Sequence, residues 1–203
     1  KADVRSWFLA VEPSIDFDWI RVRAQGLYAS GDKDPFDNKA QGFDAIFENP
    51  QFAGADTSYW IRQPVPLIGG GGVVLSGRNG LLNSMRSSKE QGQSNFLNPG
   101  TVLFGVGADF DVLPELRVFA NINHVSFAET PIVEVARNQA LSSKSIGWDT
   151  SISLLYRPNF TQNIVLRASG AMLSGGGAFK ELFATDRSGD KFYSVLFNLI
   201  LTY

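Results

Sequence analysis

Five arginines occupy polar positions in segments where polar and apolar residues alternate: Arg21, Arg23, Arg117, Arg157 and Arg167. Side chains at alternate positions of a strand point to one face, so the pattern places all five on the polar side of a sheet. Rings of arginine select anions in pores, and the planar guanidinium fork suits a carboxylate. In a competing interpretation the arginines pair with acids of the same wall, namely Glu12, Asp16, Asp109 and Asp149. The sequence leaves both interpretations open.

Three more residues share these polar positions and complete the predicted pore lining. Asn121 and Asn123 lie an even number of residues after Arg117, and Asp149 lies an even number of residues before Arg157. Each therefore falls on the same face of its strand as the arginine. Amide and carboxylate side chains of this kind line water-filled barrels. We therefore predict that they face the same interior as the arginines.

Acidic residues cluster in a loop sequence after the second alternating segment. Asp32, Asp34 and Asp37, with Asp44 further on, offer the carboxylates that calcium prefers. The spacing lacks the glycine and the distal glutamate of an EF-hand loop. A turn in which the aspartates cap their own backbone is the competing interpretation, and the one that the spacing favours.

His124 is the only histidine, and it lies between Asn123 and Ser126. Serine, histidine and asparagine together suggest a hydrolase embedded in a barrel wall. Side chains alternate between faces along a strand, so neighbours at these spacings do not form a contact between nucleophile and base. We predict an interfacial histidine, no enzymatic activity and no cofactor.

The elements that must position these residues are runs with a period of two. In the last thirteen residues, the odd positions from Tyr193 to Tyr203 are all large and apolar, while the even positions are mixed. Such alternation is typical of a strand with two unlike faces. Six other runs share it, at residues 3–16, 19–30, 101–111, 116–125, 146–157 and 164–173. Pro13 lacks a ladder donor, so imperfect pairing is expected there.

Composition narrows the class of protein. The chain has 203 residues, 44% of them apolar, and its mean hydropathy is −0.04. No run approaches the roughly 18–20 apolar residues of a membrane helix, whereas a barrel exposes only every second residue to lipid. The formal charge of −2 and the lack of a basic cluster argue against nucleic acid as a partner. The absence of cysteine excludes disulfides and suits export through an oxidising periplasm.

The connections between the runs alternate between short and long. Residues 31–98 form the longest irregular region, and residues 126–145 form a medium loop with an expected helix within 131–141. Short turns on one side and long loops on the other are typical of an outer-membrane barrel. We therefore predict an all-β fold, an antiparallel up-and-down transmembrane barrel whose apolar face contacts outer-membrane lipid, with 31–98 as an extracellular loop. A soluble β-sandwich is the competing fold.

The number of strands carries a further prediction. Single-chain bacterial barrels have an even number of strands with both ends in the periplasm. Seven runs therefore predict that residues 1–203 are the C-terminal part of one larger barrel domain whose upstream strands are missing.

Three stretches resemble a known family: LYASGDKDPFDNKAQGFDAIFENPQFAG at 27–54, IGWDTSISLLYRP at 146–158, and the terminal strand. They are similar to the alginate-export family of bacterial outer-membrane porins. The resemblance implies an antiparallel barrel of more than seven strands that conducts a solute across the outer membrane. Members that export alginate use a positively charged pore for an anionic polysaccharide. Residues Tyr193–Tyr203 also resemble the C-terminal signal read by the bacterial barrel-assembly machinery.

Pattern and resemblance together predict a porin or export channel in the bacterial outer membrane. Its expected cargo is a hydrophilic solute or polysaccharide, and the arginines favour an anion. The alternative is a barrel that serves as a scaffold or sleeve for a partner protein, such as a periplasmic component.

Overall fold

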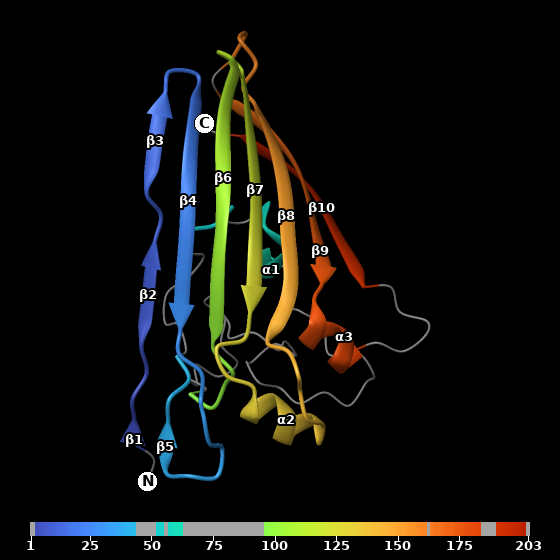
Figure 1. Ribbon diagram of the computed structural model, residues 1–203. Helices are drawn as coiled ribbons and strands as arrows, with labels where there is room; N and C mark the ends of the chain where they lie inside the picture. Colours follow the sequence, from blue (N-terminus) through green and yellow to red (C-terminus); the bar gives the residue numbers. More distant parts are fainter. Residues whose placement is uncertain are drawn as a thin grey trace.

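The computed structural model describes residues 3–43, 52–54, 57–62, 96–161, 163–183 and 190–201. Its main feature is a curved antiparallel sheet whose strands lie side by side in chain order (Figure 1). The order is β10 (Lys191–Leu201), β9 (Ile164–Gly175), β8 (Ser145–Tyr156), β7 (Leu116–Ser126), β6 (Thr101–Leu113), β4 (Ile20–Ala29) and β2 (Phe8–Val11), with β3 (Ser14–Phe17) also on β4. The prediction of an all-β, antiparallel fold is confirmed.

Every predicted alternating run contains a strand, and only the first is divided. β2 and β3 both pair with β4, and Glu12 and Pro13 lie between them. The carbonyl of Pro13 still accepts a hydrogen bond from the Ala24 amide at 3.1 Å. The imperfect pairing expected at Pro13 is therefore found as a break of two residues. A short parallel pair, β1 (Asp3–Val4) and β5 (Lys39–Ala40), lies outside the main sheet.

The connections separate the two ends of the sheet. Turns at 18–19, 114–115 and 157–163 lie at one end, which we call the turn end. The long connections that follow β4, β7 and β9 leave the sheet at the other end, the loop end, where Figure 1 places α2 and α3. This asymmetry between short and long connections is as predicted, although much of 31–98 lies outside the described residues.

Three short helices occur in the described parts of these long connections: α1 (Tyr59–Arg62), α2 (Pro131–Arg137) and α3 (Gly177–Phe183). The prediction of a helix within 131–141 is confirmed by α2, whose C-cap, Asn138, has a left-handed φ of 50°. Alternation did not predict α1 or α3. None of the helices in the described ranges is long and apolar enough to cross a membrane.

The two faces of the sheet differ in what covers them. The face that we call the outer face carries exposed apolar side chains on strand after strand: Val22, Val106, Ile122, Ile152, Leu166 and Phe197. The opposite, inner face is covered in part by α1 and α3, which pack against β8 and β9. In Figure 1, α1 lies behind the sheet near the middle of the strands.

The hydrophobic core lies at the loop end of the inner face. The strands contribute Leu27, Leu103, Val125 and Leu173. The connections contribute Phe127, Ile132, Val133, Phe179 and Leu182, and the segment around α1 contributes Ala53, Tyr59 and Trp60. Burying one such side chain stabilises the fold by roughly 1.5–3 kcal/mol. This core therefore fixes the long connections over one end of the sheet.

Two glycines on neighbouring strands give a matched test of the register. Gly147 lies at an irregularity in the pairing of β7 with β8, and its φ is +145°. A Cβ at this position would be 2.0 Å from the Ser174 carbonyl oxygen. Gly170 faces the outer side, with no atom within 4 Å of the corresponding position. Gly147→Ala should lower the free energy of unfolding by about 1–3 kcal/mol, whereas Gly170→Ala should leave it unchanged or raise it slightly. Denaturant unfolding measures both, and equal effects would contradict the described register.

Candidate functional site

The character of the inner-face side chains changes along the strands, from the loop end to the turn end. Nearest the loop end, the inner positions are apolar and belong to the core. The middle carries amides, a carboxylate and hydroxyls: Gln25, Asn121, Asn123, Asp149 and Ser151. Nearest the turn end, the inner positions carry ion pairs. Because alternation holds along every long strand, the predicted site residues lie on one face, as the sequence indicated.

Arg23 and Asp109 form the most protected ion pair of this face. Their charged atoms lie 2.8 Å apart, and the side chains are 17% and 14% exposed. The Arg23 guanidinium also donates to the Asn121 Oδ1 at 3.1 Å. The link crosses from β4 over β6 to β7, so it ties three strands together.

Two other arginines pair with aspartates close to the turns. Arg21 donates through two guanidinium nitrogens to Asp16, and Arg117 does the same to Asp111. Both pairs are about half exposed. For Arg21, Arg23 and Arg117, pairing within the wall is therefore what the structure contains. Asp16 and Asp109 were foreseen as partners, and Asp111 was not.

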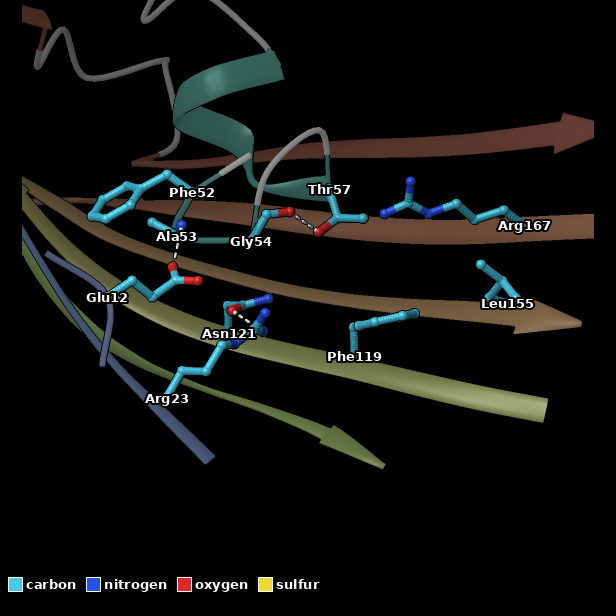
Figure 2. A pocket seen from close by; sticks show the side chains of 10 residues that line it. All are labelled: Glu12, Arg23, Phe52, Ala53, Gly54, Thr57, Phe119, Asn121, Leu155 and Arg167. Carbon is cyan, nitrogen blue, oxygen red and sulfur yellow. Dashed lines mark hydrogen bonds between the residues drawn. The ribbon is translucent and has the colours of Figure 1, made fainter. Parts of the chain in front are cut away.

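The remaining two predicted arginines lie at different depths. The Nε atom of Arg167 donates to the Ser153 Oγ at 3.0 Å, and Figure 2 shows its guanidinium directed toward Thr57. Arg157 is exposed at the turn end, and it lines a small cleft with Glu115 and Arg117.

A part of the first long connection lies on the middle of the inner face. We call residues 52–54 and 57–62 the docked segment. The Ala53 amide donates to a Glu12 carboxylate oxygen at 3.0 Å, and the Ala53 carbonyl accepts from the Asn123 Nδ2 at 3.1 Å. Gln25 donates to the Oδ1 of the same asparagine. The docked segment is thus held on both sides by wall side chains.

Asp149 forms the strongest anchor of the docked segment. Its carboxylate accepts from the Trp60 amide at 2.8 Å and from the Tyr59 amide at 3.2 Å. The side chain is 0% exposed. A buried carboxylate is costly unless donors satisfy it, and here the first amides of α1 do so. Asp149 and Glu12, which the sequence offered as partners of arginine, bind backbone amides instead.

Asn121, Asn123 and Asp149 therefore face inward as predicted, but the described chain covers them. Gly54 lies directly over Asn121, since a Cβ at Gly54 would be 3.0 Å from the Asn121 Nδ2. These residues line the wall beneath the docked segment, whereas the charged positions lie beyond it toward the turn end.

A cleft of about 300 Å³ opens between the docked segment and the wall (Figure 2). Its lining combines donors, acceptors and apolar surface: Glu12, Arg23, Phe52, Ala53, Gly54, Thr57, Phe119, Asn121, Leu155 and Arg167. Such a mixture can contact a hydrophilic solute through its polar edges. No group in it has the arrangement of a nucleophile with its base.

The aspartates considered for calcium cap turns instead. Asp32 is buried and accepts from the amides of Asp34 and Gln41 at 3.0 and 3.1 Å. Asp34 and Asp37 each accept from the amide two residues further on. Burial raises the pKa of the Asp32 carboxyl above its ordinary value. Within the described ranges, no group of three or more metal-ligating side chains occurs. Asp44 lies outside them.

His124 lies on the outer face between two aromatic rings. Its ring centroid is 5.0 Å from that of Phe104 and 5.0 Å from that of Trp148. Its Nε2 is 2.9 Å from the Ser145 Oγ, a partner that the sequence did not indicate. Asn123 points to the opposite face, so the constellation of asparagine, histidine and serine considered from the sequence is not assembled.

Comparisons of the chain with protein-family models, curated proteins and solved structures find no match. The likeness to the alginate-export family remains an interpretation of the sequence, and function has to be argued from the geometry.

Two aspartates of β6 give a matched test of the wall pairs. Asp109 pairs with Arg23 in a mostly buried position, whereas Asp111 pairs with Arg117 where both side chains are half exposed. Removing a partner from a buried charge costs about 1–3 kcal/mol or more, while exposed pairs contribute about 0–1 kcal/mol. Asp109→Asn should therefore destabilise the fold more than Asp111→Asn does in denaturant unfolding. The reverse order would contradict the described burial of the Arg23 pair.

Proposed function

We propose that this chain forms part of the wall of an antiparallel β-barrel in the bacterial outer membrane, and that the barrel is a channel for a hydrophilic solute. The apolar outer face carries the proposal. Monomeric soluble proteins rarely expose a contiguous apolar patch larger than a few hundred Å², yet here exposed apolar residues extend from β4 to β10. Lipid would cover this face without a second layer of protein.

Two further features fit a membrane wall. β6, β8, β9 and β10 contain 13, 12, 12 and 11 residues, and a tilted membrane strand needs about 9–11. Exposed aromatic residues of the outer face lie toward both ends of the strands, with Trp19 and Tyr156 at the turn end and Tyr28, Phe104 and Trp148 nearer the loop end. Aromatic girdles at these two levels are typical of outer-membrane barrels.

The inner face supports a channel. Its turn half carries arginines and aspartates rather than apolar residues, and a water-filled barrel has a polar interior. A barrel would close when β10 and the edge formed by β2 and β3 each gain a neighbouring strand. Arg157, which is exposed at the turn end, would favour anions, in line with the resemblance to porins that export an anionic polysaccharide.

The membrane-wall proposal makes a prediction about the two faces. Ile152 is 54% exposed on the outer face near the middle of β8. Phe119 lines the inner cleft, and its strand partners are Asp109 on β6 and Ser153 on β8. In a bilayer, Ile152→Arg should cost about 2–4 kcal/mol because arginine would meet the midplane. Phe119→Arg should cost less, since it faces the polar lumen beside a carboxylate. Urea unfolding from phospholipid vesicles measures both.

A water-soluble sheet would give the opposite order. Ile152→Arg would then be harmless on an exposed surface, and Phe119→Arg would be the damaging change. That outcome would overturn the membrane-wall proposal.

Conductance in a planar bilayer tests the channel itself. We expect ion conductance with a preference for anions, and a lower permeability ratio of anion to cation in Arg157→Glu. Arg5→Glu provides the control, because Arg5 lies outside the main sheet beside Asp3. A barrel without conductance would overturn the channel and favour the sleeve for a partner protein. A preference for cations in the unmodified protein would overturn the role of the arginines.

A further inference from the structure

The polar side chains in the middle of the inner face are dry, which is unexpected for the lining of a water-filled lumen. Gln25, Asn121, Asn123, Asp149 and Ser151 are all buried, with exposed fractions of 4% or less. The hydrophobic core reaches this region through Ala53, Tyr59 and Trp60, which belong to the docked segment. Among the described residues, the docked segment is what lies over them.

The wall holds this segment in two ways: the side chains of Tyr59 and Trp60 are buried in the hydrophobic core, and polar wall side chains bind its backbone. Glu12 and Asn123 bind the amide and the carbonyl of Ala53, and Asp149 binds the amides of Tyr59 and Trp60. Hydrogen bonds from backbone amides to an ionised carboxylate are roughly twice as strong as neutral ones. The two carboxylates therefore supply most of the polar attachment, and Asp149 supplies it in the drier position.

Gly54 shows that the contact with the wall is close. Its φ is +89°, and a Cβ there would lie 3.0 Å from the Asn121 Nδ2 and 3.2 Å from the Ser151 Oγ. Any larger residue would both strain the backbone and push the segment away from β7 and β8. Glycine thus lets the chain approach the wall where Asp149 holds it.

The docked segment also forms one side of the cleft in Figure 2. Gly54 and Thr57 face Asn121 and Arg167 across it. The position of the segment therefore sets the width of this cleft.

We propose that the docked segment is the constriction of the channel and that Asp149 is the positioning residue that holds it against the wall. This inference rests on the proposed channel function. It assigns the size limit for solutes to the contact between the docked segment (residues 52–54 and 57–62) and the inner face. Charge selection is assigned separately, to the arginines nearer the turn end.

The test measures pore size rather than charge. In planar bilayers, neutral polymers of graded size define the exclusion limit. Asp149→Asn keeps the side-chain volume but replaces one acceptor oxygen with an amide donor, which would face a backbone donor. The docked segment should then be held less firmly, so the exclusion limit should shift to larger polymers and the conductance should rise. Gly54→Ala acts at the other contact and should shift both in the same direction.

Asp111→Asn is the matched control, because it removes another inner-wall carboxylate that is half exposed and pairs with Arg117 toward the turn end. It should change ion selectivity and leave the polymer limit in place. Hydrogen exchange provides a direct readout, since the amides of Tyr59 and Trp60 should exchange faster in Asp149→Asn and Gly54→Ala but not in Asp111→Asn.

The outcomes separate the two proposals. No conductance from the unmodified protein would overturn the channel. Conductance with an unchanged polymer limit in both Asp149→Asn and Gly54→Ala would overturn the constriction and leave the channel standing. If Asp149→Asn does not fold, Gly54→Ala decides the question by the same measurements.

Discussion

The backbone ladder of the sheet decides which surroundings each side chain meets. Strands from β4 to β10 pair in sequence order, and a slip of one residue would turn every apolar side chain from one face to the other. The outer face is apolar along all of these strands, so such a slip would bring apolar residues against the docked segment and arginines to the outside. The irregularities between β6 and β7 and between β7 and β8 lie near the strand ends. The faces therefore stay separate through the middle of the sheet.

The inner face meets two conflicting requirements. At the loop end it must hold long connections in place, and apolar side chains do this by forming a core. At the turn end it carries charges, which need partners or water. The buried polar middle joins these zones, because backbone groups of the docked segment satisfy its carboxylate and amides. A purely apolar segment could not cover Asp149, since it would leave a buried charge without donors.

Strand positions and faces could be predicted because period two is a local signal. β4 spans Ile20–Ala29 where alternation indicated 19–30, and apolar spacing indicated α2. The α3 helix follows a run of glycines, and α1 is only four residues long, so neither has a strong local pattern. Asp111 shares the parity of Asp109, so its pairing with Arg117 could have been found from the sequence.

The surroundings of Asp149 could not have been predicted in this way. Its parity places it inward, but the amide that it binds most closely is 89 residues away in the chain. No periodic pattern connects a strand to a distant loop, and the same is true of Asn123 and Ala53, which are 70 residues apart. Pattern thus predicts the face of a residue, whereas its exposure depends on chain that folds back from elsewhere.

This distinction also applies to the five arginines of the inner face. Arg21, Arg23 and Arg117 each have an aspartate partner, so their charges are compensated and they mainly brace the wall. Arg167 reaches the cleft beside the docked segment, and Arg157 lies near the turns. The five arginines therefore do not form one uniform ring: three are paired with aspartates in the wall, one lies beside the docked segment, and one is exposed at the turn end.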